Sequence, residues 1–272
     1  MNKLKFNLVK ITAVSVIAIV AIQLSSCRKV RLDKELTRNF CIPSTKSGAI
    51  YEIDVALPEN YDPNGHYSTI YVLDAKRDFG YVANKCRDIS GQKSIPNAIV
   101  IGIRYGNDRS VDYTPTKVKE GGGGAFRFME FIKDELIPKI EADFAADTSR
   151  SKRVILGHSF GGLLCAYAFT SHNEVFGNYI MLSPSLWYDN EVVLKYEQAS
   201  SEEAKNKEQL VFMGIGASEN EDRMLAPFER FYQQLAENHP NMKLAKNVEK
   251  GRGHMGSKDP NIEKGLEFFF SK

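Results

Sequence analysis

The stretch Arg153-Val-Ile-Leu-Gly-His-Ser-Phe-Gly-Gly162 constrains the fold of this chain more than any other segment. Its aliphatic half is typical of a buried strand, and it ends abruptly at Gly157-His-Ser-Phe-Gly161, which matches the pattern G-x-S-x-G. The apolar run from Leu163 to Phe169 follows and predicts a helix. A strand, a sharp turn and a helix in this order lift a serine above the edge of a sheet, and small residues two positions away leave room for the turn. We therefore predict a nucleophilic Ser159; the alternative is a tight turn without catalytic meaning.

Strand-like and helix-like segments alternate along most of the chain. Short apolar runs, typical of buried parallel strands, occupy 69–73, 98–103, 154–156, 179–182 and 210–213, with an alternating strand at 49–57 and a weaker one at 242–248. Apolar residues at helical spacing predict helices over 129–140, 224–235 and 262–270, with a kink or break at Pro138. This alternation predicts an α/β-hydrolase fold over residues 36–272, with a mostly parallel central sheet and helices on both faces.

The first 26 residues have a different character. Lys3, Lys5 and Lys10 give a basic start, and an apolar run from Ile11 to Leu24 follows that is too short for a comfortable membrane span. The segment ends in Leu24-Ser-Ser-Cys27, which resembles the lipobox of bacterial lipoproteins. We predict a lipoprotein signal peptide over 1–26, a lipidated Cys27, a tether over 27–35, and an exported protein of the bacterial cell envelope. An ordinary cleaved signal, with Cys27 present by chance, is the alternative.

Composition argues against several partners and cofactors. The chain has 272 residues, with 36 basic and 34 acidic side chains and a net charge of +2, which predicts no nucleic-acid partner. The glycines at 121–124 do not match a phosphate-binding loop, because the third residue after Gly123 is Phe126. No Cys/His spacing predicts a zinc site, and the chemistry below needs neither a metal nor an organic cofactor. A disulfide between Cys41 and Cys86 stays an open alternative.

A serine nucleophile needs a base and an acid, which follow the serine in the order acid, then histidine, in this fold. Of the five histidines, His254 lies in the glycine-rich segment Lys250–Gly256 after the last predicted strand, where the base is expected, whereas His158 inside the turn points elsewhere. The acid should follow the strand at 210–213, and Glu219, Glu221 and Asp222 compete for this role. We favour Glu219, the nearest to the strand end, because the other two resemble residues of a first helical turn.

Several motifs point to a known family. They are Tyr51–Pro58 with Tyr61-Asp62, Ile70–Asp74, Arg109 with Asp112–Pro115, Glu135–Pro138, Gly157–Gly162, Ser183–Trp187 and Gly253–Met255. Through these motifs, residues 36–272 resemble the putative-esterase family of α/β-hydrolases, which includes esterase D, siderophore esterases such as enterochelin esterase, feruloyl esterases and mycolyltransferases. The resemblance is strongest to the siderophore-esterase-like branch.

The resemblance implies further site residues. The backbone N–H groups of Phe160 and Lys76 would form the oxyanion hole, with Lys76 in a loop after the strand that ends at Leu73-Asp74. Trp187 would stack on an aromatic acyl group or cap the core. Arg104 or Arg109 would hold an anionic group of the substrate, or form surface salt bridges instead.

These features predict a serine esterase that acts through an acyl-enzyme on small-molecule or oligosaccharide esters. Siderophore-type or other exported esters are the leading substrates, and acetyl or feruloyl esters of carbohydrates are an alternative. An acyltransferase is another alternative, and a non-catalytic binding protein on a hydrolase scaffold is an alternative of a different class. We expect contact with a membrane only through the N-terminal lipid.

Overall fold

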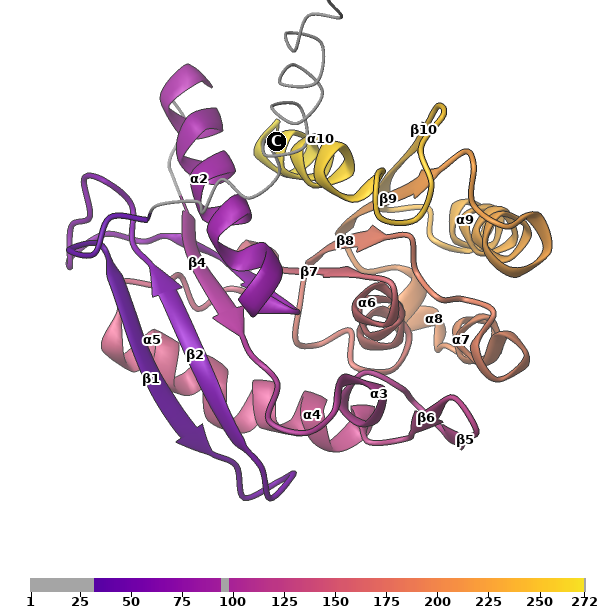
Figure 1. The fold of residues 1–272 in the computed structure, drawn as a ribbon, viewed down its shortest axis with the longest axis horizontal. Helices are drawn as coiled ribbons and strands as arrows, with labels where there is room; N and C mark the ends of the chain where they lie inside the picture. Colours follow the sequence, from indigo (N-terminus) through magenta and orange to yellow (C-terminus); the bar gives the residue numbers. More distant parts are fainter. Residues whose placement is uncertain (1–31, 94–97, 272) are drawn as a thin grey trace, which may run out of the picture. The chain divides into compact units, whose positions relative to one another are not determined.

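An eight-stranded sheet forms the centre of the computed structural model (Figure 1), which describes residues 32–93 and 98–271. The predicted signal peptide and Cys27 lie outside the described residues. The strands of the sheet are β1 (Thr37–Pro43), β2 (Ile50–Ala56), β3 (Ser68–Val72), β4 (Ala98–Ile103), β7 (Arg153–His158), β8 (Asn178–Leu182), β9 (Gln209–Gly216) and β10 (Met242–Glu249). A separate two-stranded ribbon joins β5 (Lys117–Val118) to β6 (Gly121–Gly122).

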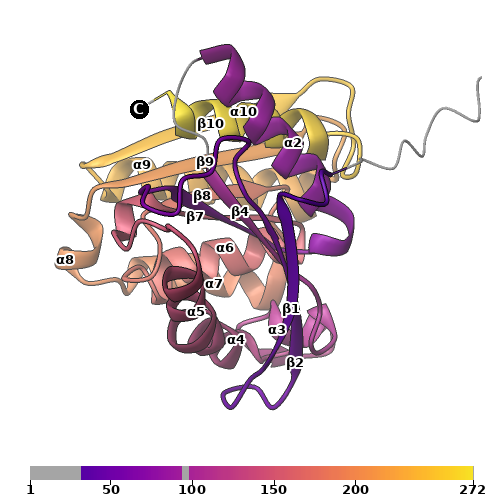
Figure 2. The ribbon, with the colours of Figure 1, turned by 90° about the vertical axis from the view of Figure 1, so that its left-hand side faces the viewer.

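The strand order, β1-β2-β4-β3-β7-β8-β9-β10, determines where a site can form. β2 pairs antiparallel with β1 and β4, whereas the pairs from β4 to β10 are parallel. The chain moves from β3 to β4 in one direction and from β7 to β10 in the other. A crevice opens at such a reversal, at the carboxyl ends of the strands. β3 and β7 are neighbours at this point, so the segments that follow them lie together. Figure 2 shows the twist of the sheet, in which β1 and β2 cross the direction of β9 and β10.

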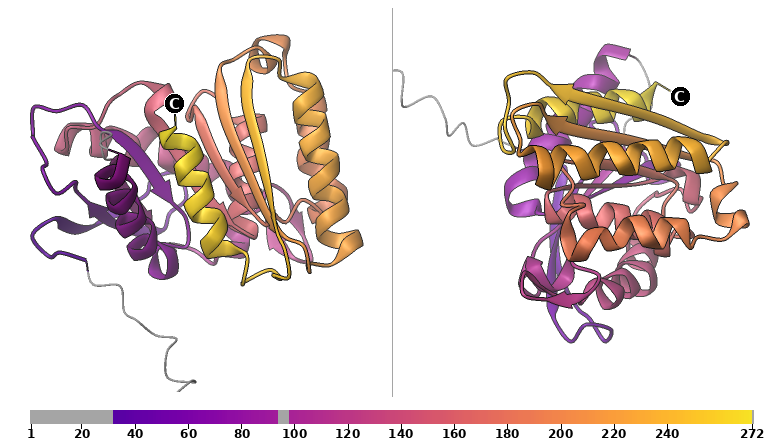
Figure 3. Two further views of the ribbon diagram at one scale, coloured as in Figure 1. Left: turned by 90° about the horizontal axis from the view of Figure 1, so that it is seen from above. Right: turned by 90° about the vertical axis from the view of Figure 1, so that its right-hand side faces the viewer.

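Helices cover both faces of the sheet. One face carries α2 (Ala75–Lys93) and α10 (Lys258–Phe270), which lie side by side (Figure 3). The other carries α4 (Ala125–Phe131), α5 (Ile137–Asp143), α6 (Phe160–Ser171), α7 (Tyr188–Gln198) and α9 (Ala226–Asn238). Successive strand residues point to opposite faces, so Ile70 and Val72 pack with the first group and Tyr71 with the second. The predicted α/β-hydrolase fold is thereby confirmed.

Short helices complete the chain: α3 (Arg109–Asp112), α8 (Glu202–Lys205) and a 3-10 turn at Arg150–Lys152. The break predicted at Pro138 is a π-helical turn, Ile132–Leu136, in which the Ile137 N–H bonds the Ile132 carbonyl. Proline has no N–H to donate and clashes with a carbonyl in a regular helix, and the wider turn removes that conflict. A second π-helical turn, Glu221–Leu225, precedes Pro227 in the same way.

The described cysteines are free thiols, and the described helices include no membrane span. Cys41 is an exposed free thiol and Cys86 a buried one, so the open disulfide alternative is not formed. Cys165 is a free thiol buried in α6, where it packs as a small apolar residue. Among the described helices, none has the length and apolarity needed to cross a membrane.

Candidate active site

Ser159 lies at the strand-order reversal, in the turn between β7 and α6. Its backbone angles, φ 62° and ψ −118°, are strained for a residue with a side chain. Three hydrogen bonds hold this backbone: the Ser159 N–H donates to Leu182 O, and the N–H groups of Leu163 and Ser185 donate to Ser159 O. The strain is therefore imposed by β8 and by the start of α6.

The glycines around Ser159 have different reasons to be small. A Cβ on Gly157 would lie 2.4 Å from the backbone of Gly161, which no side chain could tolerate. A Cβ on Gly162 would lie 2.9 Å from Leu182 O. Gly161 is different, because its added Cβ would find no atom closer than 3.4 Å. The steric explanation predicted for both Gly157 and Gly161 thus holds for Gly157 and is wrong for Gly161.

His254 and Glu219 form a hydrogen-bonded pair at the ends of β9 and β10. The distance between His254 Nδ1 and Glu219 Oε2 is 2.7 Å. The other carboxylate oxygen, Oε1, accepts hydrogen bonds from Ser183 Oγ at 2.6 Å and from the Gly216 N–H at 3.0 Å. Burial favours a higher pKa for Glu219, but hydrogen bonds from His254, Ser183 and Gly216 outweigh it and lower this pKa below its ordinary value. Glu219 is thus ionised, and His254 Nδ1 donates to it.

Of the three acid candidates, Glu219 is the one that the structure brings to His254. Its side chain is buried, whereas Glu221 and Asp222 are exposed in the π-helical turn that starts at Glu221. Ser159, Glu219 and His254 all line one cavity of about 390 Å³. Among the described residues, no hydrogen bond joins Ser159 Oγ to the His254 ring. Catalytic hydrogen bonds are often long without substrate and shorten when it binds.

His158, the residue before Ser159, supports the histidine loop. Its side chain is buried, and its Nε2 lies 2.9 Å from the carbonyl oxygen of His254. Because a carbonyl can only accept, Nε2 carries the proton and donates. Burial, together with the nearby His254 ring 4.5 Å away between centroids, lowers the pKa of His158 to about 4. His158 is therefore neutral at ordinary pH and holds the His254 backbone, in agreement with the prediction that it is not the base.

The two predicted oxyanion donors both lie in first helical turns. Phe160 is the first residue of α6 and Lys76 the second residue of α2, where backbone N–H groups have no partner within the helix. The prediction of a loop at Lys76 is corrected, because α2 begins directly after Asp74, which takes a positive φ of 53°. Neither Phe160 nor Lys76 is among the residues that line the cavity. Both helix starts adjoin the Ser159 turn, because Leu73 and Asp74, directly before α2, lie next to Gly161 in α6, and N–H groups and dipoles at helix N-termini favour a developing negative charge.

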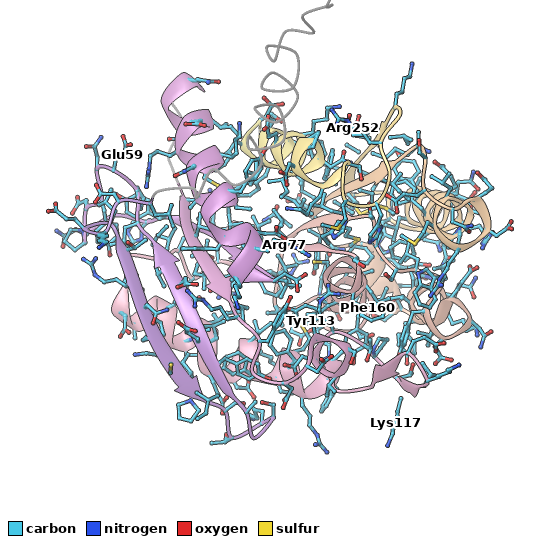
Figure 4. The ribbon with its side chains drawn as sticks, in the orientation of Figure 1. Glu59, Arg77, Tyr113, Lys117, Phe160 and Arg252 are labelled. Carbon is cyan, nitrogen blue, oxygen red and sulfur yellow. The ribbon has the colours of Figure 1, made fainter. Side chains whose placement is uncertain are left out.

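Arg109, for which substrate binding and salt bridging were both predicted, forms an ion pair that connects these two helix starts. Its guanidinium bonds the buried Asp74 carboxylate twice, at 3.0 and 2.9 Å, and also bonds the His158 carbonyl at 3.3 Å. It lies over the rings of Phe160 and Tyr113. Figure 4 shows Phe160 and Tyr113 near Arg77, which also contacts Asp74. Arg109 therefore braces the segment that carries Lys76 against the turn that carries Ser159.

Of the other two residues predicted to bind substrate, Trp187 lines the cavity and Arg104 does not. Arg104 pairs with Asp54 at 2.7 Å and with Glu52 at 2.9 Å, and neither it nor Arg109 is among the residues that line the cavity. Trp187 does line the cavity and also packs on Phe160, so it has both of the predicted surroundings. Arg223, which the sequence analysis missed, lines the same cavity and lies 3.7 Å above the Trp187 ring.

A metal site needs several His, Cys, Asp or Glu side chains that meet at one point. Within residues 32–93 and 98–271, no group of three or more His, Cys, Asp or Glu side chains is arranged to hold a metal ion. The chemistry available to the site is that of a serine, a histidine with an ionised carboxylate, and backbone N–H donors. This set can transfer an acyl group from an ester to serine and on to water.

Comparisons with known proteins agree with this geometry. A family model described as Putative esterase matches residues 44–258. Ferri-bacillibactin esterase BesA of Bacillus subtilis (strain 168) is 29% identical over 231 residues, which cover 72% of this chain and 79% of that protein. The BES protein of Bacillus cereus has a similar structure, with a TM-score of 0.79 and 28% identity over 90% of this chain and 98% of that one. The siderophore hydrolase EstA of Aspergillus nidulans shares the fold, with a TM-score of 0.77 and 22% identity over 87% and 94% of the two chains.

Proposed function

The chain belongs to the Putative esterase family of serine hydrolases, and from this membership we propose that it hydrolyses siderophore-type esters through an acyl-enzyme. The observation that carries the proposal is the contact of His254 with the ionised Glu219 in the cavity that Ser159 also lines. The names of the relatives support the substrate class, since BesA is a ferri-bacillibactin esterase.

In the proposed first half-reaction, Ser159 Oγ attacks the ester carbonyl carbon and its proton passes to His254 Nε2. Glu219 holds the opposite nitrogen, Nδ1, and stabilises the imidazolium that forms. The carbonyl oxygen becomes an oxyanion, which accepts hydrogen bonds from the backbone N–H groups of Phe160 and Lys76. When this intermediate collapses, the alcohol leaves with the proton from His254, and Ser159 carries the acyl group.

The second half-reaction uses water in place of the alcohol. His254 takes a proton from the water, which attacks the acyl carbon, and the acid is released as Ser159 regains the proton. The His254 side chain is 38% exposed, so water can reach it. This exposure favours hydrolysis over acyl transfer, for which water must be excluded.

A fluorophosphonate probe and a panel of esters test the proposal. The wild-type protein should be labelled and Ser159→Ala should not; equal labelling of both, or none of either, would overturn the serine mechanism. The panel contains p-nitrophenyl acetate, a longer acyl ester, methyl ferulate, an acetylated xylan and a catecholate trilactone. We expect the highest kcat/KM for the trilactone, whereas preference for methyl ferulate or the xylan would indicate a carbohydrate esterase.

The location of the protein is a further part of the proposal. We propose export after cleavage before Cys27, lipidation of Cys27, and a tether over 27–35 that leads into the esterase domain over 36–272. The Leu24-Ser-Ser-Cys27 sequence supports this proposal. Metabolic labelling with a fatty acid should mark the wild-type protein but not Cys27→Ala, and labelling of the variant would contradict lipidation.

A further inference from the structure

Arg223 lines the catalytic cavity and has no acidic partner among the described residues. Arg77, Arg104 and Arg109 are all paired with carboxylates. In the part of the chain that the structure describes, no salt bridge involves Arg223, not even with its neighbour Asp222. A guanidinium carries five N–H donors in a planar fork that fits carboxylate groups, so these donors are free to bind an anion.

Trp187 positions this free cation. The guanidinium carbon of Arg223 lies 3.7 Å from the centre of the Trp187 ring, well inside the range of a cation–π contact. Trp187 itself packs on Phe160 and Tyr188, so it is anchored in the protein. Stacking limits the rotamers of a long side chain, and less entropy is then lost when the guanidinium binds a ligand.

Arg223 also stands between two hollows. It lines the cavity of about 390 Å³ that contains Ser159 and His254, and a neighbouring one of about 550 Å³. Trp187 lines both as well. Among the described residues that line the catalytic cavity, Arg223 is the one arginine or lysine. A substrate whose ester carbonyl sits at Ser159 would therefore extend past this cation into the second hollow.

The wall of the second hollow is rigid and strained. Asp189, Asn190 and Glu191 all have left-handed backbone angles, with φ of 45°, 52° and 60°. Such angles are strained for residues with a side chain, and they persist only where the surroundings impose them. Thr116 Oγ1 donates to Asp189 Oδ2 at 2.6 Å, and Arg230 pairs with Glu191. Asn190 and Glu191 thereby form a fixed wall beside Trp187 and Arg223.

From these observations we propose that Arg223, held flat on Trp187, binds an anionic oxygen group of the substrate, such as a carboxylate or a catecholate. Arg223 then selects esters that carry such a group on the part that extends beyond the ester carbonyl. The inference rests on the proposed esterase function and assigns a specificity residue to it.

A matched pair of esters tests this role. The anionic ester is mono-p-nitrophenyl glutarate, and the neutral one is p-nitrophenyl methyl glutarate, in which a methyl group caps the same carboxylate. Release of p-nitrophenolate gives kcat and KM for both. For Arg223→Gln we expect the ratio of kcat/KM, anionic over neutral, to fall about tenfold, because one charge-assisted hydrogen-bonded contact is lost. The fall should appear mainly in KM, and the neutral ester should keep its kcat/KM within about twofold.

Two further variants and the neutral ester separate the possible outcomes. Arg223→Lys keeps the charge but not the planar fork, so its ratio should lie between those of wild type and Arg223→Gln. Arg127→Gln removes the same charge from the exposed face of α4 and should leave the ratio unchanged. An unchanged ratio in Arg223→Gln, or an equal loss for both esters, would overturn the inference. If the wild type cleaves neither ester, the proposed function on which the inference rests falls instead.

Discussion

Asp74 is a fully buried carboxylate whose charge is compensated by protein groups. Arg109 bonds it twice, Arg77 contacts it, and the Tyr105 hydroxyl donates to it at 2.5 Å. For Arg109→Met we expect a loss of about 3 kcal/mol in the free energy of unfolding, because a buried charge loses its main partner. We also expect a drop of up to about a hundredfold in kcat, because the oxyanion donor at Lys76 is no longer braced. Urea unfolding and steady-state kinetics measure the two effects.

Two control variants distinguish the loss of charge compensation at Asp74 from the nonspecific effect of removing a bonded arginine. Arg104→Met also removes a doubly bonded arginine, but one that bonds Asp54 instead of Asp74 and the His158 carbonyl, so it should leave kcat close to the wild-type value. In the double variant Asp74→Asn with Arg109→Met, no buried charge is left, so its loss of stability should be smaller than the sum of the single losses. Additive losses, or a kcat effect in Arg104→Met as large as in Arg109→Met, would contradict the proposed brace.

His158 makes the stability of the protein depend on pH. Its pKa is lowered to about 4 in the folded protein, mainly by burial, whereas an unfolded histidine has a pKa of about 6.5. Between these values the unfolded chain binds a proton that the folded one does not, so stability falls as pH falls. We expect the free energy of unfolding to be roughly 2 kcal/mol lower at pH 5 than at pH 7 from this group. His158→Gln keeps an N–H donor without titrating, and urea unfolding should show a smaller pH slope; an equal slope would exclude His158 as the cause.

Sequence patterns identify the catalytic candidates better than the residues that support them. Ser159 and His254 are marked by glycines close to them in the chain, and the turn after β9 narrows the acid to three neighbours. Which of the three faces His254 depends on where Ser183 and the Gly216 N–H lie, and this requires the fold. Asp74, which pairs with Arg109, and Trp187, which lies under Arg223, are 35 and 36 residues away in the chain from these arginines, so no local pattern could assign them.

At the scale of elements, the turn from β7 to α6 makes unequal demands on its glycines. Gly157→Ala would place a Cβ 2.4 Å from the Gly161 backbone, so the strand or helix must move. We expect a loss of about 3 kcal/mol in stability and about a hundredfold in kcat/KM, because Ser159 shifts relative to His254. Gly161→Ala should cost little stability, since alanine favours a helix by up to about 1 kcal/mol and no atom is closer than 3.4 Å. Thermal unfolding and ester kinetics compare the two, and equal damage would contradict this account.

Among the elements that were not predicted, β1 and α2 were missed for different physical reasons. In β1 only Ile42 is buried, so this edge strand shows no apolar alternation and forms because it pairs with β2. In α2 the buried residues Phe79, Val82, Ala83, Cys86 and Ile89 recur at helical spacing, so a signal was present among many polar residues. The buried parallel strands were predictable because they are apolar on both faces. The π-helical turns could be expected only as breaks, since proline marks the position but not the form of the break.

At the scale of the whole esterase domain, the active site depends on contacts between segments at opposite ends of the chain. α2 begins with the proposed oxyanion donor at Lys76, and α10 begins directly after the loop that carries His254. Lys258, near the start of α10, bonds the buried Asp78 in the first turn of α2 at 2.5 Å. Farther along, Tyr81 donates to Glu263. These contacts span 180 and 182 residues of sequence. They hold α2, which carries Lys76, against α10, which follows the His254 loop, and these two segments are the two halves of the site.

Lys258→Met is the test of this connection. Both side chains of the Lys258–Asp78 pair are buried, so the variant leaves a buried carboxylate without its main partner and should lose about 3 kcal/mol of stability. Because the first turns of α2 and α10 flank the site, kcat should fall as well. Lys264→Met, on the same helix, breaks an ion pair with Glu249 whose lysine is 47% exposed, and exposed pairs contribute at most about 1 kcal/mol. Urea unfolding and ester kinetics should therefore separate the two variants. Equal losses would mean that α10 stabilises the domain through its apolar face, and that the Lys258–Asp78 pair does not hold the two halves of the site together.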